Sequence, residues 1–255
     1  MILAADIGNS NIVLGGLTDG KVSFQERIRT DRQKTAAEYA ADIRNACNLH
    51  HVSAEDTGGA VLCSVVPEVT SNLSAAISDF TGRSVLTVTS DLDTGLSMEH
   101  MDSPHSVGTD LIVEAAGASD YYGTPVAVFD LGTASTCCVV DDKRNYIGEM
   151  IYPGIRISLD ALSQRCSQLP VIDVAAPADF IAHNTVDSMK SGIIYSNAAI
   201  IDGMTAQIEE ELGHPVITVV TGGFAGTIAP FCRKKIILDD ELIMKGLYVI
   251  YQRNR

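Results

Sequence analysis

The sequence predicts an α/β fold built from two similar halves. A short phrase occurs twice, in which an apolar run ends in Asp, any residue, Gly and a small polar residue: Asp6-Ile7-Gly8-Asn9-Ser10 and Asp130-Leu131-Gly132-Thr133. The two copies stand about 124 residues apart, and a second apolar run and a turn follow each of them. The order of three strands, a helix, a strand, a helix and a strand repeats at the same spacing, which is typical of a duplicated α/β protein.

The first half contains apolar runs that predict its strands and helices in order. Strands are expected at Ile2–Ala5, Asn11–Leu17, Lys21–Arg29, Ala60–Val66 and Ser84–Thr89, and helices at Thr35–Leu49, Val69–Phe80 and Thr109–Tyr122. Asp19-Gly20 is a two-residue hairpin signal between the second and third strands. The uninterrupted apolar run before Pro67 is typical of a buried parallel strand, which the proline is expected to stop.

The second half repeats this order. Strands are expected at Val126–Asp130, Ser135–Val140, Tyr146–Met150 and Val216–Val220, and helices at Ser158–Ser167, Met189–Leu212 and Glu241–Gln252. No linker rich in Pro and Ser separates the halves, so the helix after Gly108 is the expected join. We therefore expect an N-terminal half over residues 1–113, a C-terminal half over residues 114–255, and a cleft between them.

The composition narrows the classes of function. Hydrophobic residues make up 46% of the 255 residues, which allows a large core, and the net charge of −14 argues against nucleic-acid binding. The six cysteines form no C-x-x-C pair and predict reduced thiols, and the scattered histidines predict no zinc site. No basic segment precedes the first apolar run and no stretch is long enough to cross a membrane, so we expect a cytoplasmic protein without a membrane partner.

The residue types at the repeated phrase indicate phosphate chemistry. A strand that turns back at Asp-x-Gly presents backbone N–H groups and a carboxylate, which together can hold a phosphate and a metal ion; an ordinary Asx turn is the alternative. Asp110 after Gly108-Thr109 is either a general base or a helix cap. Thr221-Gly222-Gly223 permits close approach to a flat ligand, or is a plain strand-to-helix turn.

The ordered set of motifs resembles the type III pantothenate kinases, within the acetate and sugar kinase/actin-like superfamily, over nearly the whole chain. The matching segments are Asp6–Val13, Arg29-Thr30, Ser64–Pro67, Val107–Asp110, Asp130–Thr136, Pro153–Ile155, Leu169-Pro170, Asn184-Thr185, Thr221–Gly223 and Lys245–Leu247. The resemblance implies two ribonuclease-H-like halves, each a mixed five-stranded sheet with flanking helices. It also implies ATP-dependent phosphorylation of the primary hydroxyl of pantothenate to 4'-phosphopantothenate, in coenzyme A biosynthesis, by a homodimer.

The same resemblance implies roles for single residues. Asp110 would be the catalytic base, Asp6 would hold Mg²⁺, and Asp130 would hold a monovalent cation, K⁺ or NH4⁺. The expected contacts to ATP, or to another nucleoside triphosphate, are Asp6, Ile7, Gly8, Asn9, Ser10, Asn11, Ile12, Val13, Thr133, Gly222 and Gly223. The expected substrate contacts are Gly108, Thr109, Asp110, Leu111 and Thr185, of which Thr185 could instead belong to the cap of the following helix.

Three departures from the family pattern all concern the acceptor side. Leu111 stands where the family has Arg, Glu149 where it has a second Gly, and His100 or Met101 where an aromatic residue is common. An Arg offers a fork of donors to an anionic substrate and Leu offers none, for which Arg156 or Arg165 could compensate. Two alternatives follow: a nucleotide-binding regulatory paralogue with little kinase activity, and a kinase for another hydroxylated acceptor.

Overall fold

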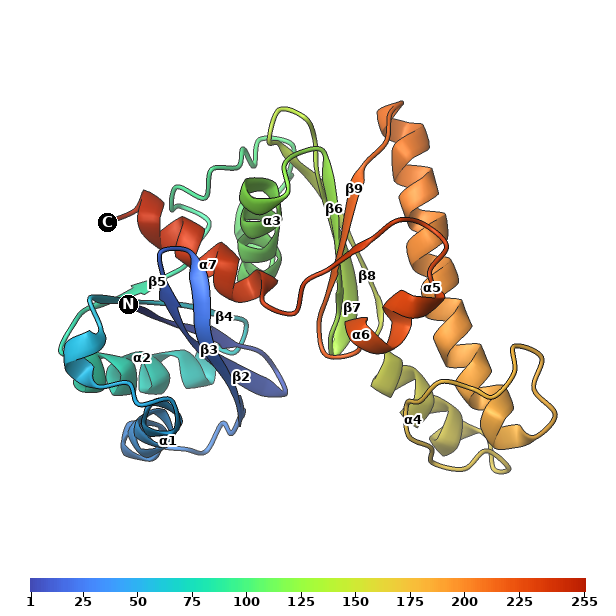
Figure 1. The fold of residues 1–255 in the computed structure, drawn as a ribbon, viewed down its shortest axis with the longest axis horizontal. Coiled ribbons are helices and arrows are strands. Elements are labelled where there is room, and N and C mark those ends of the chain that lie inside the picture. The colour runs from blue at the N-terminus through green and yellow to red at the C-terminus, as the bar shows by residue number, and fades with distance from the viewer. The chain divides into compact units, whose positions relative to one another are not determined.

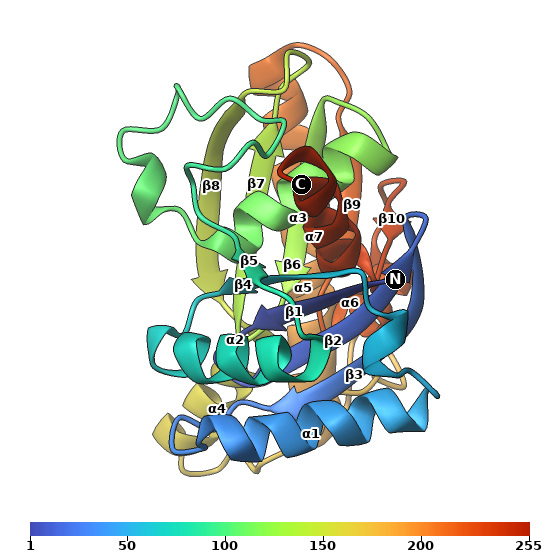
Figure 2. The same ribbon diagram turned by 90° about the vertical axis from the view of Figure 1, so that its left-hand side faces the viewer.

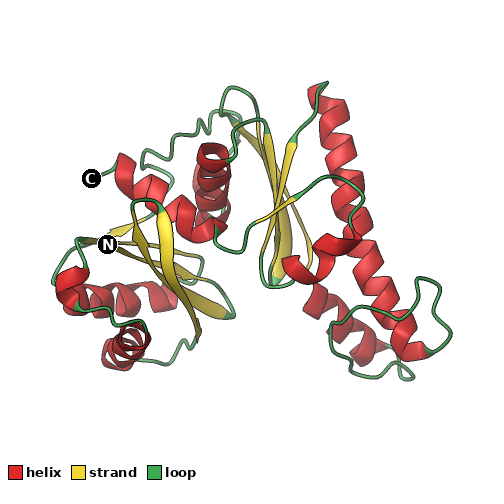
Figure 3. Cartoon of the chain, viewed as in Figure 1, coloured by secondary structure: helices red, strands yellow, loops and turns green.

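The chain forms two compact units in the computed structural model, which describes residues 1–255. The first unit comprises Met1–Asp120 together with Glu241–Arg255, and the second comprises Tyr121–Asp240. Figures 1 and 2 together label the helices and strands of each unit, and Figure 3 shows that each contains one sheet with helices around it.

The first unit is built on a mixed five-stranded sheet. Its strands are β1 (Ile2–Ile7), β2 (Asn11–Thr18), β3 (Lys21–Arg29), β4 (Gly59–Ser64) and β5 (Val85–Thr87), in the spatial order β3-β2-β1-β4-β5. The strand β1 runs antiparallel to β2 and parallel to β4. In Figure 2, α1 (Ala36–Leu49) and α2 (Pro67–Thr81) lie together along one face of this sheet.

Local signals in the sequence explain these elements. Asp19 and Gly20 both adopt positive φ, 51° and 76°, which confirms the hairpin turn between β2 and β3. Thr35 and Glu38 form a capping box at the start of α1. Pro67 does not follow the strand directly, because β4 ends at Ser64 and the proline is the first residue of α2, where its missing N–H costs no hydrogen bond.

The core of the first unit lies on both faces of its sheet. One cluster fills the space under α1 and α2, with Tyr39, Ile43 and Leu73 fully buried. The other cluster includes Ala4 and Val61 of the sheet and the apolar side of α7 (Leu242–Arg253), together with α3 (Thr109–Tyr121). The last helix therefore completes a core that the first strands begin.

The second unit repeats the connectivity of the first. Its strands are β6 (Val126–Leu131), β7 (Ala134–Val140), β8 (Tyr146–Pro153), β9 (Ile217–Thr221) and β10 (Ile237–Leu238), in the order β10-β9-β6-β7-β8. The helices are α4 (Ile155–Arg165), α5 (Thr185–Leu212) and α6 (Ala225–Ile228). Short 3₁₀ turns occur at Ala54–Asp56 and Pro104–Ser106 in the first unit and at Ala229–Phe231 in the second. Two sheets with equivalent strand orders confirm the predicted duplicated α/β fold.

The contacts divide the chain differently from the halves expected from sequence. The boundary falls after Asp120 and not at residue 113, because α3 stays with the first sheet as a whole helix. The expectation also placed the last helix in the C-terminal half, whereas α7 packs on β1 and β4 of the first unit. None of the helices combines the length and hydropathy that a membrane span requires.

Candidate active site

The first Asp-x-Gly phrase forms the tight loop between β1 and β2. The N–H of Gly8 donates to the carbonyl of Asn11 at 3.0 Å, and a Cβ on Gly8 would lie only 3.1 Å from that oxygen. Asn9, Ser10 and Asn11 are exposed at the tip of the loop. The loop therefore presents backbone N–H groups and short polar side chains, the combination that binds phosphate.

The predicted nucleotide segment, residues 6–13, contains two kinds of residue. Ile7 and Ile12 are fully buried in the core under α1 and α2, so their side chains hold the loop to the sheet. They can meet a ligand only through backbone atoms.

The segment after β3 fastens this loop from the other side. The hydroxyl of Thr30 donates to the carbonyl of Gly8 at 2.7 Å, and its N–H donates to the carbonyl of Ser10 at 3.1 Å. The Arg32 guanidinium donates to Oδ1 of Asn9 at 3.4 Å. Sequence reasoning used Thr30 only as part of a matching segment, and its position directly after a strand next to the phosphate loop was the available signal.

The end of β4 links Asp6 to the segment that carries Asp110. Asp6 and Cys63 are partners in the parallel ladder of β1 and β4, and the Cys63 thiol donates to Oδ1 of Asp6 at 3.1 Å. One residue further along β4, the carbonyl of Ser64 accepts the Thr109 hydroxyl at 3.0 Å. Two successive residues of one strand thus contact both the predicted magnesium ligand and the first residue of α3.

Asp110 lies in the first turn of α3, where the helix dipole favours a carboxylate. Its Oδ1 accepts the N–H of Leu111 at 2.9 Å. The Gly108 carbonyl accepts the N–H of Ile112, so Gly108 directly precedes the helix. A Cβ on Gly108 would collide with Oδ1 of Asp110, so any side chain here would force that carboxylate to move. The helix-cap interpretation of Asp110 is wrong, because Gly108 occupies the cap position and Asp110 is the second residue of α3. The general-base interpretation stays a prediction.

Leu111, at the position of the family Arg, is 6% exposed. A Cβ on Gly108 would lie 3.3 Å from the Leu111 Cδ1 atom, so the leucine side chain lies beside the glycine that precedes the helix. It offers this region apolar surface and no hydrogen-bond donor.

The second Asp-x-Gly phrase forms the loop between β6 and β7 in the second unit. Gly132 and Gly222 border the Asp130 carboxylate: a Cβ on Gly132 would lie 3.1 Å from Oδ2, and one on Gly222 would collide with Oδ1. Gly222 has a φ of +94°, and it lies in the turn that leads from β9 to α6. Thr133 is exposed at the loop tip, and Gly154 at the start of α4 packs against the Thr133 backbone.

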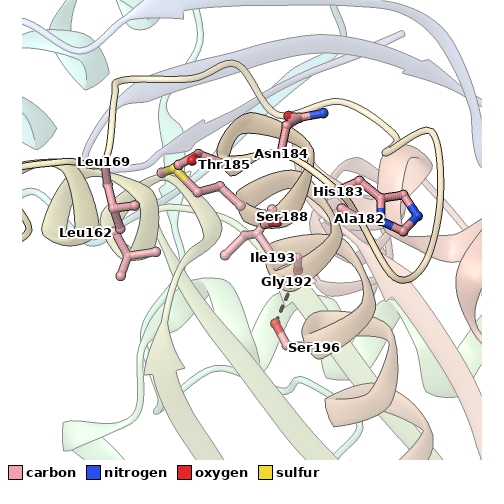
Figure 4. A pocket seen from close by; sticks show the side chains of 11 residues that line it. Leu162, Leu169, Ala182, His183, Asn184, Thr185, Ser188, Gly192, Ile193 and Ser196 are labelled. Carbon is pink, nitrogen blue, oxygen red and sulfur yellow. Dashed lines mark hydrogen bonds between the residues drawn. The ribbon is translucent and has the colours of Figure 1, made fainter.

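Thr185 is the first residue of α5 and borders an open hollow of about 690 Å³ in the second unit. Asn184 caps this helix, since its Oδ1 accepts the N–H of Asp187 at 2.9 Å. Figure 4 shows the lining side chains, which come from α4, from the segment before α5 and from the first turns of α5: Leu162, Leu169, Ala182, His183, Asn184, Thr185, Ser188, Met189, Gly192, Ile193 and Ser196. Thr185 therefore belongs to the helix start and also faces a space that a ligand or partner could fill.

Glu149 lies on β8, where its carboxylate accepts the hydroxyl of Tyr146 at 2.6 Å. Tyr146 is fully buried, so this bond satisfies a hydroxyl that would otherwise lose water on folding. The Glu149 charge is thereby tied to its own strand. Arg156, a candidate substitute for the missing Arg, donates to the carbonyl of Ile172 at 3.3 Å.

The fold has solved relatives of very different sequence. A Campylobacter jejuni protein assigned to the Baf family of transcriptional activators has a TM-score of 0.58 at 18% identity, covering 98% of this chain and 97% of that one. The ROK hexokinase of Thermus thermophilus has a TM-score of 0.51 at 13% identity, covering 98% of both chains. At these identities the likeness concerns the fold alone.

The two sheets of equivalent strand order, with an Asp-x-Gly loop in each, give the chain a duplicated actin-like fold, and its sequence profile places it among small-molecule kinases. The sequence profile described as type III pantothenate kinase matches residues 2–207. A type III pantothenate kinase from Halalkalibacterium halodurans is 37% identical over 254 residues, which cover 100% of both chains. The chain belongs to the type III pantothenate kinase family.

Proposed function

We propose that this chain transfers the γ-phosphoryl group of ATP to the primary hydroxyl of pantothenate. One observation carries the proposal beyond family membership: the end of β4 contacts Asp6 through Cys63 and contacts Thr109, beside Asp110, through Ser64. The predicted phosphate loop and the predicted base are thus held by successive residues of a single rigid strand. Phosphoryl transfer depends mainly on positioning and on charge neutralisation, and a shared strand supplies the positioning.

The loop at Gly8, Asn9 and Ser10 would bind ATP phosphates through its N–H groups and polar tips. Asp6 offers a hard oxygen donor, which suits Mg²⁺. No group of three or more His, Cys, Asp or Glu side chains capable of holding a metal occurs in the chain. The single carboxylate of Asp6 fits a Mg²⁺ whose other ligands are the phosphates of the nucleotide and water, which is how Mg²⁺ is often bound. When bound, Mg²⁺ neutralises phosphate charge.

Asp110 would accept the proton of the attacking hydroxyl. Its Oδ1 is engaged by the Leu111 N–H, and this bond orients the carboxylate without removing its charge. A base near its ordinary strength suffices here, because little proton transfer is required early in a loose transition state. Gly108 leaves the space in which this orientation is possible.

In the second unit, Thr133 would contact ATP phosphates and the turn at Gly222-Gly223 would contact the adenosine. Asp130 would hold K⁺ or NH4⁺. Its carboxylate, bordered by Gly132 and Gly222, is a hard oxygen donor in a place where a side chain would collide, and both features fit such an ion. A monovalent cation supplies compensating positive charge near the phosphates. The free state of all six cysteines supports a reducing compartment such as the cytoplasm.

We also propose a homodimer in which Thr185 contacts the substrate. Several apolar side chains of α4, of the segment before α5 and of the first turn of α5 are exposed, and Leu162 among them lines the Thr185 hollow: Ile157, Leu162, Val171, Phe180, Ile181 and Val186. Exposed apolar side chains on neighbouring segments of the chain are typical of an interface. A second copy of the chain is the occupant that the family favours, and it would also enclose Thr185.

The dimer can be tested by sedimentation equilibrium on the variant Ile181→Lys. Ile181 is 75% exposed, and Leu49, which is 71% exposed in the first unit, provides the matched control Leu49→Lys. We expect wild type and Leu49→Lys to sediment as dimers and Ile181→Lys as a weaker dimer or a monomer. A monomeric wild type, or equal dimerisation of all three proteins, would contradict the proposal.

The kinase activity is tested by ADP release from ATP, Mg²⁺, K⁺ and pantothenate, with Asp110→Asn as the control. The amide keeps the shape of the side chain but cannot accept the proton as a carboxylate does. Turnover with pantothenate that is lost in the variant supports the proposal. Nucleotide binding without turnover would favour a regulatory paralogue, and turnover only with other hydroxylated compounds would favour another acceptor.

The second of these alternatives has one specific observation in its favour, the buried Leu111. A hydrogen bond to a charged group contributes about 1.5–3 kcal/mol, so an Arg that reached the pantothenate carboxylate would be worth on the order of 10- to 100-fold in kcat/KM. A gain of this size in Leu111→Arg, with pantothenate but not with an acceptor that lacks the carboxylate, would identify a weakened pantothenate kinase.

A further inference from the structure

The thiol of Cys63 contacts the predicted magnesium ligand in the core of the first unit. Its Sγ lies 3.1 Å from Oδ1 of Asp6, a normal distance for a sulfur donor. Cys63 is fully buried, and the backbone register of β1 and β4 places it directly beside Asp6. The contact is therefore fixed by the sheet and is shielded from water.

Cys63 is held in the form that donates. A carboxylate oxygen can only accept a hydrogen bond, so the 3.1 Å contact requires the proton to lie on sulfur. The fully buried position beside a carboxylate also disfavours a second negative charge there. Toward an ionised carboxylate such a thiol can act only as a donor.

Asp6 needs an orienting contact of this kind. The χ2 torsion of an aspartate is broad, so rotamer preference alone does not fix the plane of its carboxylate. A hydrogen bond to Oδ1 restricts that rotation. It therefore also fixes the direction in which Oδ2 points. Mg²⁺ demands near-ideal octahedral geometry, so a ligand oriented in advance binds it at lower cost.

We propose that Cys63 is a positioning residue for Asp6, which orients the carboxylate for the magnesium of the nucleotide complex. This inference rests on the proposed function of Asp6. It requires no contact between Cys63 and ATP, and no reaction at sulfur. Its expected size is modest, because a thiol is a weak donor: loss of the bond should weaken binding by about 3- to 10-fold.

The test compares Cys63→Ala, Cys63→Ser and Cys47→Ala in the full chain. Serine restores a donor at the same place, and Cys47 is an equally buried thiol in α1, away from the site, which controls for loss of a buried sulfur. Calorimetry measures the affinity for a non-hydrolysable ATP analogue with and without Mg²⁺, and turnover measures KM and kcat. Thermal unfolding reports whether each variant is folded.

We expect Cys63→Ala to lose about 3- to 10-fold in affinity for the magnesium complex, and Cys63→Ser to recover most of this loss. Affinity for the metal-free analogue should change less, and Cys47→Ala should bind as wild type. Unchanged magnesium-dependent affinity in Cys63→Ala, or equal loss in the Ser variant, would overturn the proposal. The variant Asp6→Asn distinguishes the proposed role of Asp6 from the proposed role of Cys63. If Asp6→Asn binds the magnesium complex as tightly as wild type, the function proposed for Asp6 fails. If Asp6→Asn binds it more weakly but Cys63→Ala binds it as tightly as wild type, only the positioning role of Cys63 fails.

Discussion

Gly108→Ala should damage the reaction while leaving the fold as stable as before. The new Cβ would collide with Oδ1 of Asp110 and would lie 3.3 Å from Cδ1 of Leu111, and Gly108 does not need a positive φ. The group that must move is thus the carboxylate of Asp110, the proposed base. Restoring ordinary van der Waals contact requires the carboxylate to move by about 1 Å.

The expected loss of kcat follows from this displacement of the carboxylate. A misplacement of about 1 Å in a reacting group can cost on the order of 100-fold, or about 2.7 kcal/mol, so kcat should fall by that factor. The free energy of unfolding should stay the same or rise by about 0.4–1 kcal/mol, because Ala restricts the unfolded chain. Gly108→Ala should therefore lose activity without losing stability.

Steady-state kinetics and thermal unfolding measure the two effects on one preparation. Gly203→Ala is the matched control, because Gly203 is exposed in α5 and a Cβ there meets no atom within 4 Å. We expect the control to keep wild-type kcat. The reasoning is refuted if Gly108→Ala turns over at the wild-type rate, or if its loss of kcat is accompanied by an equal loss of folded protein.

Three further results are expected. Thr30→Val removes the 2.7 Å bond to the Gly8 carbonyl and should raise KM for ATP by about 3- to 10-fold, whereas Thr30→Ser should not; equal KM values in both would contradict the role of the hydroxyl. Gly222→Ala imposes a φ of +94° on alanine and a collision with Asp130, so the melting temperature should fall and half-maximal activity should require more K⁺; an unchanged K⁺ response would argue against an ion at Asp130. Of the six thiols, only the exposed Cys166 should react rapidly with a disulfide reagent in the native state. Burial protects Cys63 and raises the pKa of Cys47 to about 11. Rapid reaction of several thiols would indicate a looser core.

The order of strands and helices could be predicted from sequence because local signals dominate there. Lys21–Arg29 was predicted with the bounds of β3, since the Asp19-Gly20 turn fixes where the strand begins. The start of α5 was placed at Met189, four residues late. The first turn of that helix is polar and is set by the Asn184 cap, so apolar periodicity does not detect it.

The contacts that organise the site could not be predicted in this way. Cys63 and Asp6 are 57 residues apart in the chain, and Thr30 and Gly8 are 22 apart. Each pair depends on strand register or on loop path, which no local pattern encodes. The family motifs indicated which residues matter around Asp6 and Asp110, but not that one strand end joins them.

The position of α7 has a consequence for how this chain is made. Met244, Leu247 and Ile250 of this helix lie in the same cluster as Ala4 and Val61, although the whole second unit lies between them in the sequence. Domains often fold during synthesis from the N-terminus onward. Here the first unit cannot complete the burial of one face of its sheet until the residues of α7 have been synthesised. A chain that stopped before Glu241 would keep every residue of the proposed site. It would still have an incompletely covered core, exposed to aggregation and to quality-control proteases.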